Sequence, residues 1–143
     1  MTAERPRDPL GRPLPADADP TLAVPGISSI DDLSDEQVWA IAMDYLEHGM
    51  PFHAHEVFEA RWRTAPPDER AAWQALAQWT AAETHLARGN HEGARRLAHR
   101  ATELLGTAAH VPPSIDILRV RAACRHLVSL PGTSLGAGGE VTP

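Results

Sequence analysis

The sequence predicts an all-α protein, a compact bundle of about five helices around a central, buried third helix. Apolar residues recur at helical spacing in each segment between the two ends of the chain, and no segment has the pattern of a β-hairpin. In addition, Glu83 is the only charged residue between Arg70 and Arg88. A helix with so few charges must be buried on most of its sides.

The composition is that of a small acidic globular protein. The chain has 143 residues, of which 43% are hydrophobic and 22% charged, values typical of one globular domain. Its net charge of −6 argues against nucleic acid or an anionic membrane as the main partner. No stretch has the apolar length of a membrane span, and the N-terminal residues lack the apolar core of an export signal. The single cysteine, Cys124, excludes an intramolecular disulfide and a multi-cysteine zinc site. We therefore expect a cytoplasmic protein.

Both ends of the chain differ in composition from its middle. Residues 1–27 are rich in Pro, Asp and Arg and show no periodicity, and residues 131–143 are rich in Gly. Neither stretch can bury enough apolar surface to order itself. We predict two flexible tails that flank one helical domain over residues 28–130.

The first two predicted helices have clear start and stop signals. Ser34 and Gln37 have the spacing of a capping box, and Gly49 supplies a C-terminal stop. Between them lies an apolar face at helical spacing, made of Val38, Ile41, Ala42 and Tyr45. The second helix is predicted to begin near Pro51 and to run past Trp62.

Three further helices follow. Pro66 and Pro67 are expected to break the second helix and to form the first turn of the third, which ends at Gly89. Asn90 is expected to cap a fourth helix, and residues 114–129 to form a fifth. The fourth has a single apolar face made of Ala94, Leu97, Ala98, Ala101, Leu104 and Leu105. Because the linkers are short, neighbouring helices should pack antiparallel.

Four sequence blocks carry a family resemblance. In the order HAHEVFEARW, WQALAQ, HLARGNHEGARRL and VPPSIDIL, the chain resembles family 309 of the domains of unknown function, which is bacterial and archaeal. The family pattern is an HE-x-x-E-x-x-W helix, a Gln-rich buried helix and a His-x-x-x-Gly-Asn turn, and the resemblance covers about residues 33–130. The matching positions are His55, Glu56, Glu59, Trp62, Gln74, Gln78, His85, Gly89, Asn90, Ala94 and Asp116.

The chain departs from the family pattern at two positions. Ala75 stands where members usually have Gly, and Arg61 stands where they have an acidic or apolar residue. Neither position belongs to the matching polar residues. The resemblance implies a compact all-helical fold, and it implies no reaction.

Polar residues of the second and third helices are predicted to meet. On a helical wheel, His55 and Glu59 share one sector of the second helix with Phe52, Phe58 and Trp62. Gln74, Gln78 and His85 form a stripe on the third helix, opposite Trp73 and Trp79. We expect His55 and Glu59 to lie over this stripe. The candidate polar cluster is therefore His55, Glu56, Glu59, Gln74, Gln78 and His85.

Two interpretations of this cluster stay open. The first is a buried hydrogen-bond network that fixes helix register and needs no cofactor. Base rates favour it, because roughly two His–carboxylate pairs at a spacing of four arise by chance in such a composition. The second is a divalent metal site, zinc or manganese, with His55, Glu59 and His85 as ligands and Glu56 nearby. The second interpretation makes the protein a metal-assisted hydrolase or a small-ligand binder.

The remaining motifs are less specific. Arg121 and His126 have a spacing that resembles a motif of helical ribonucleases, but such a pair arises readily by chance. The arginines at 95, 96 and 100 fit the polar face of an amphipathic helix and, with acidic neighbours, argue against a nucleic-acid surface. Cys124 fits a small core residue.

Whether the protein is an enzyme is left open by its sequence. The favoured function is that of a non-enzymatic helical protein that acts through a protein partner or as a homo-oligomer. Its tryptophans exceed the aromatic surface that one small core needs, and Trp is enriched at interfaces. These residues are Trp39, Trp62, Trp73 and Trp79.

Overall fold

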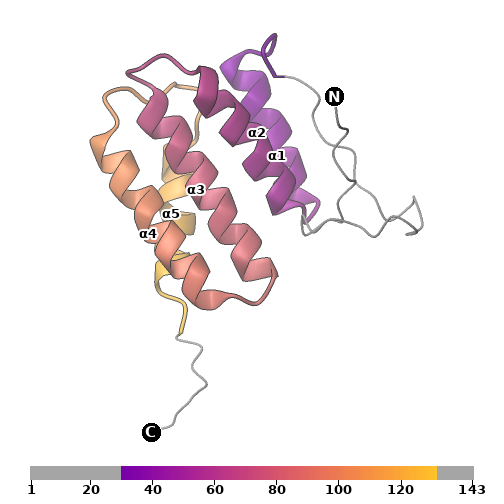
Figure 1. Cartoon of the computed structure of the whole chain (residues 1–143), viewed down its shortest axis with the longest axis vertical. Coiled ribbons are helices and arrows are strands. Elements are labelled where there is room, and N and C mark those ends of the chain that lie inside the picture. Colours follow the sequence, from indigo (N-terminus) through magenta and orange to yellow (C-terminus); the bar gives the residue numbers. More distant parts are fainter. Residues whose placement is uncertain (1–29, 132–143) are drawn as a thin grey trace, which may run out of the picture.

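The described part of the chain folds as five helices. The computed structural model describes residues 30–131, and no strand occurs among them, which confirms the predicted all-α class. The predicted tail over residues 1–27, and all but the first residue of the predicted tail over residues 131–143, lie outside the described residues. In chain order the helices are α1 (Asp35–Glu47), α2 (Pro51–Thr64), α3 (Arg70–Ala87), α4 (His91–Thr107) and α5 (Ile117–Val128), as Figure 1 shows.

The third helix is central, as predicted. α3 lies between α2 and α4, with α1 beyond α2 and α5 packed against α4 (Figure 1). Its large side chains are buried: Trp73 and Leu76 are 0% exposed and Trp79 is 2% exposed. This burial explains why α3 has almost no charged residues.

α2 and α3 run antiparallel. Phe52 in the first turn of α2 lies beside Arg88 at the end of α3, and Trp62 in the last turn of α2 lies beside Arg70 at the start of α3. The two helices therefore face each other along their whole length. This arrangement places the polar residues of α2 beside α3.

Most helix ends follow the predicted signals. The hydroxyl of Ser34 accepts a hydrogen bond from the backbone N–H of Gln37 (3.1 Å), and the Gln37 side chain accepts one from the backbone N–H of Ser34 (2.9 Å), so the capping box is confirmed. Gly49 (φ +73°) and Gly89 (φ +82°) end α1 and α3 in the left-handed region that favours glycine. Asn90 caps α4, as predicted.

Two predicted boundaries are wrong. Pro66 and Pro67 precede α3 instead of forming its first turn: they begin a separate turn in which the N–H of Glu69 donates to the carbonyl of Pro66 (2.9 Å). α5 begins at Ile117 and not near residue 114, because the carboxylate of Asp116 accepts a hydrogen bond from the N–H of Arg119 and caps the helix there.

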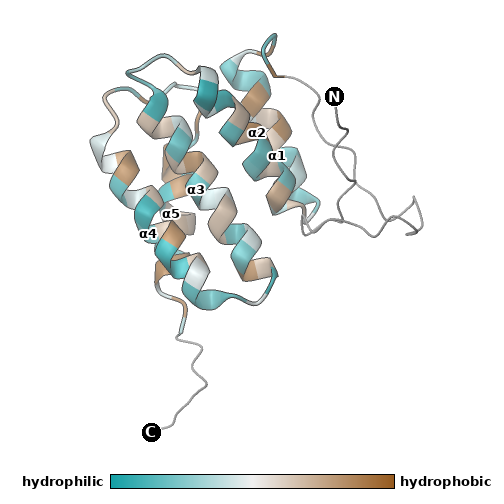
Figure 2. Cartoon of the chain, in the orientation of Figure 1, coloured by the Kyte–Doolittle hydropathy of each residue, from teal (hydrophilic) through white to brown (hydrophobic). Residues whose placement is uncertain are grey.

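The core is built largely from small and aromatic side chains. Hydrophilic and hydrophobic residues alternate around the helices in Figure 2, as amphipathic helices require. The alanines that α3 and α4 bury at 0% exposure let the two backbones approach closely; they are Ala72, Ala75, Ala82, Ala94, Ala98 and Ala101. Among the described residues, no helix combines the length and apolarity that a bilayer crossing needs.

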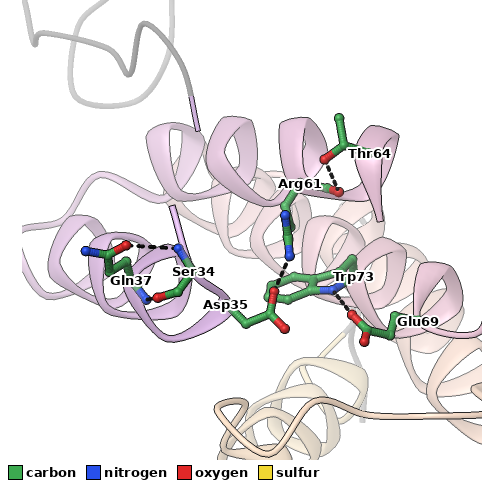
Figure 3. Close-up of polar contacts among 7 residues, drawn as sticks. All are labelled: Ser34, Asp35, Gln37, Arg61, Thr64, Glu69 and Trp73. Carbon is green, nitrogen blue, oxygen red and sulfur yellow. Dashed lines mark hydrogen bonds and ion pairs between the residues drawn. The ribbon is translucent and has the colours of Figure 1, made fainter. Parts of the chain in front are cut away.

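A polar network ties the first three helices together at one end (Figure 3). The guanidinium of Arg61 on α2 pairs with the carboxylate of Asp35 in the first turn of α1 and lies 5.6 Å from the ring centroid of Trp73 on α3. The indole N–H of Trp73 in turn donates to Glu69 at 3.2 Å. Arg61, a departure from the family pattern, is therefore a structural residue.

Candidate functional site

The site is centred on His55 of α2. This side chain is half-buried, and its Nδ1 lies 2.8 Å from the backbone carbonyl oxygen of Ala77 on α3. A carbonyl oxygen only accepts hydrogen bonds, so Nδ1 carries the proton. In the neutral ring the lone pair is then on Nε2, which leaves Nε2 as the acceptor or metal-ligating atom.

Two carboxylates of the same helix lie beside His55. His55, Glu56 and Glu59 each offer a ligand atom, and these atoms all lie within 4.8 Å of one another. Within residues 30–131 this is the one group of three or more His, Cys, Asp or Glu side chains with that geometry. Ligands of a tetrahedral metal ion are roughly 3–4 Å apart.

Glu59 has a second partner. Its carboxylate lies 3.2 Å from the guanidinium of Arg63, one helical turn further along α2. The Arg63 side chain is 66% exposed and that of Glu59 is 31% exposed. An ion pair with so exposed a partner stabilises little, so Arg63 can exchange for another cation at Glu59.

His85 is held by a different set of contacts. The N–H of Gly93 donates to Oδ1 of Asn90 (3.0 Å), which fixes the orientation of the Asn90 amide, and its Nδ2 then donates to Nδ1 of His85 (2.9 Å). Burial, followed by the charges of Arg88 and Arg96, lowers the pKa of His85. His85 is therefore favoured as a neutral ring with its proton on Nε2.

The group of three ligands contains Glu56 and does not contain His85. His55 contacts α3 at Ala77, eight residues before His85, which corresponds to about 12 Å of helical rise. The role of His85 as a third ligand stays a prediction, and its bond to Asn90 supports a structural role at the α3–α4 turn.

The two glutamines of the predicted cluster are half-buried on α3. Neither Gln74 nor Gln78 shares a side-chain hydrogen bond with His55; the partner of His55 on α3 is a backbone carbonyl. A hydrogen-bond network through these two amides stays a prediction.

The sequence interpretation missed His53. It placed His53 outside the polar cluster and gave it no role, but the side chain is only 5% exposed. Its ring centroid lies 5.4 Å from that of Tyr45 and 6.0 Å from that of Phe52. The sequence signal for its burial was its position beside Ala54 and four residues before Val57, which are both buried apolar residues. The buried face of α2 is therefore rotated relative to the predicted one, and His55 lies at the edge of this face.

An arginine lies at one edge of the site. The ring centroid of Phe52 is 6.1 Å from that of His55, and Cζ of Arg88 is 6.0 Å from the Phe52 centroid. Phe52 thus contacts both the candidate ligand and a guanidinium from the end of α3. The site combines metal-ligand chemistry with a nearby cation.

Two other His–carboxylate pairs at a spacing of four are solvated. Asp44 and His48 lie 3.5 Å apart, and His99 and Glu103 lie 3.7 Å apart. All four side chains are more than half exposed. His55 and Glu59 differ from them through burial and the bond to α3.

The remaining candidates give no second site. Cys124 is 0% exposed, and burial raises the pKa of its thiol to about 11, so it is an unreactive core residue, as predicted. Trp73 and Trp79 lie in the core, and Trp39 and Trp62 are half-buried against it. Because all four tryptophans are used within the domain, they no longer support the predicted partner interface.

Part of the chain matches a known family model. Residues 39–97 match the family model described as Domain of unknown function (DUF309). This span reaches from α1 into α4 and includes His55, Glu56 and Glu59. Neither a curated protein nor a solved structure matches the chain. Over residues 39–97 the chain is therefore similar to DUF309, the family that its sequence resembles.

Proposed function

We propose that the protein binds a divalent metal ion through His55, Glu56 and Glu59. The observation that carries the proposal is the separation of their ligand atoms, all within 4.8 Å of one another. One imidazole and two carboxylates suit zinc or manganese, because imidazole favours zinc and carboxylate oxygens favour manganese. The donor set of the site therefore fits such an ion.

The hydrogen bond between His55 and Ala77 supports this proposal. Metal-ligating histidines almost always donate their other ring N–H to a carbonyl, carboxylate or water. Nδ1 of His55 donates to the carbonyl of Ala77 at 2.8 Å, which orients the ring and leaves Nε2 for the ion. The solvated pair of His99 and Glu103 has no comparable support from a second helix.

The chemistry of such a site follows from its ligand number. Three protein ligands leave coordination positions open, and a metal ion there acidifies a bound water and polarises an oxygen of a bound ligand. In this chain Glu56 is exposed, which places the site at the surface, and the Phe52 ring adjoins His55. We propose that the protein binds a small ligand in the cytoplasm through this metal ion. Hydrolysis of the bound ligand would extend this function.

A structural role for the cluster is the second candidate. The His55–Ala77 hydrogen bond joins α2 to α3 and stabilises the bundle without any ion. In that case the protein acts without metal, through a protein partner or as a homo-oligomer. The two candidates differ in one measurable property, the response of the protein to metal.

Thermal denaturation of the full chain, with and without zinc or manganese, tests the proposal. We expect the metal to raise the melting temperature of the wild type by mass action. Glu59→Gln should remove this response, because an amide oxygen is a poor substitute for a carboxylate ligand. Glu103→Gln is the matched control, since Glu103 follows a histidine by the same four residues but is solvated.

The contrary result is equally clear. A wild-type melting temperature that does not change with either metal, or one that rises equally in Glu59→Gln, would reject the metal site and favour the structural candidate. Glutamine has nearly the size of glutamate, so Glu59→Gln opens no cavity that would itself lower the melting temperature.

A further inference from the structure

α5 presents an exposed basic face. The helix has three arginines, one histidine and no acidic residue, although the chain as a whole has a net charge of −6. Arg119 and Arg125 are exposed, and neither forms an ion pair with a carboxylate of residues 30–131. On a helical wheel, two exposed apolar residues lie between these arginines, Leu118, which is 76% exposed, and Ala122. The face thus combines a narrow apolar stripe with positive charge on both sides of it.

α1 presents an exposed face of the opposite charge. The helix has four acidic residues and neither Lys nor Arg. Ala40 is exposed at the centre of this face, and the exposed acidic residues around it are Glu36, Asp44 and Glu47. No arginine of residues 30–131 forms an ion pair with Glu36 or Glu47. The exposed faces of α1 and α5 are therefore complementary in charge.

The two faces do not meet within one copy of the described domain. Among its helices, α1 packs against α2, while α5 packs against α4 and α3 (Figure 1). The small residues Ala40 and Ala122, one on each face, would let two such helices approach closely. A pair of complementary surfaces that one copy does not bring together can instead be joined between two copies.

We propose that a second copy of this chain is the partner of the basic face, and that α1 of one copy packs on α5 of the next. Such an interface is heterologous, because the two copies contribute different surfaces to it. A symmetric contact between two α5 helices would instead place positive charges opposite each other. The interface uses none of the residues of the proposed metal site and does not depend on the proposed function.

Sedimentation equilibrium of the full-length wild type tests the proposal through salt. We expect a weight-average mass above that of the monomer at about 0.02 M salt, and a fall towards the monomer at about 1 M salt, where charges are screened. Leu118→Ser, at an exposed position, should weaken the association about 3-fold or more. A wild type that is monomeric at both salt concentrations, or an unchanged association of Leu118→Ser, would overturn the proposal.

Charge reversal distinguishes this interface from a symmetric one. Arg125→Glu and Glu47→Arg, both at exposed positions, should each abolish self-association at low salt. An equimolar mixture of the two variants should restore it, because each reversed face then meets the opposite charge on the other variant. Arg100→Glu, at an exposed position of α4, is the matched control, since it changes the net charge as Arg125→Glu does, and it should associate as the wild type does.

Melting temperatures close to that of the wild type establish that the reversed variants are folded. If Glu47→Arg self-associates as the wild type does, the acidic face of α1 is not part of the interface and the proposal is wrong. A mixture of the two folded variants that stays monomeric contradicts it equally.

Discussion

Nδ1 of His55 donates a hydrogen bond to the backbone carbonyl oxygen of Ala77 across the interface between α2 and α3, at 2.8 Å. The acceptor is a main-chain atom, so the contact does not depend on the side chain at position 77. It fixes the tautomer of His55 and directs Nε2 away from α3. One hydrogen bond thus serves both the stability of the bundle and the proposed metal site.

Loss of this hydrogen bond should destabilise the protein without metal. We expect His55→Ala to lower the free energy of unfolding by about 1–3 kcal/mol, because a hydrogen bond is lost and a cavity opens. Urea denaturation in the presence of a chelator measures this change. His99→Ala, at an exposed position, should change stability by less than about 0.5 kcal/mol. Equal effects of the two substitutions would show that the His55–Ala77 contact contributes nothing.

Two glycines of α4 should respond in opposite directions to the same substitution. A Cβ on Gly93 would lie 2.6 Å from Nδ2 of Asn90 and 3.0 Å from Nδ1 of His85, so Gly93→Ala should displace the N-cap and lower stability by about 1 kcal/mol. A Cβ on Gly106 would meet nothing within 4 Å, so Gly106→Ala should raise stability by about 0.5–1 kcal/mol through helix propensity.

Thermal or urea denaturation of the two glycine variants measures both changes. If Gly93→Ala stabilises the protein, the contact between His85 and Asn90 does not contribute to its stability. The same substitution in the same helix makes each variant the control of the other.

The contributions of Asp35 and Arg61 to stability should be coupled, because their side chains form an ion pair. Their side chains are 27% and 18% exposed, so Asp35→Ala leaves a guanidinium mostly buried without its carboxylate. We expect a loss of about 1–3 kcal/mol in the wild-type background. In an Arg61→Met background, where the charge is absent and much of the volume remains, the same change should lower stability by only a few tenths of a kcal/mol. Additive losses in a double-mutant cycle would contradict the coupling.

His85 should make the stability depend on pH. Burial and the charges of Arg88 and Arg96 lower the pKa of His85 in the folded protein below its ordinary value of 6.5, so the unfolded chain binds this proton more readily. The stability that neutral His85 contributes is fully present above pH 6.5 and is lost as the pH falls through the folded-state pKa.

Chemical denaturation at several pH values below 6.5, compared between the wild type and His85→Gln, measures this dependence. The variant should lose less stability on acidification, because position 85 no longer titrates. Parallel pH profiles for the two proteins would show that His85 does not cause the loss.

The helices could be predicted because their signals are local. The capping box of Ser34 and Gln37, the stop at Gly89 and the uncharged length of α3 all follow from residues that are close in sequence. The two wrong boundaries also have local causes. Asp116 competes with the prolines before it as a helix start, and Pro66 and Pro67 form a turn of their own.

The candidate site was only partly predictable, because its contacts are not recorded in the residue pattern. The wheel correctly placed His55 beside Glu59, but it assigned side-chain partners on α3, and the observed partner is the main chain of Ala77. The cap of α4 holds His85 through Asn90, a tertiary contact that helical spacing does not show. The Phe52 ring lies near His55 on its own helix, α2, and near Arg88 at the end of α3. The second of these contacts depends on the antiparallel packing of the two helices.

In the proposed metal site, Nδ1 of His55 bonds to the carbonyl of Ala77 while Nε2 binds a metal ion. The ¹⁵N NMR resonances of the His55 ring, recorded on the full chain with and without zinc, report on both ring nitrogens. We expect Nδ1 to carry the proton donated to Ala77 with and without metal, and the Nε2 resonance to shift when zinc is added. A His55 ring whose Nδ1 carries no proton, or one whose resonances do not change with zinc, would show that this assignment is wrong.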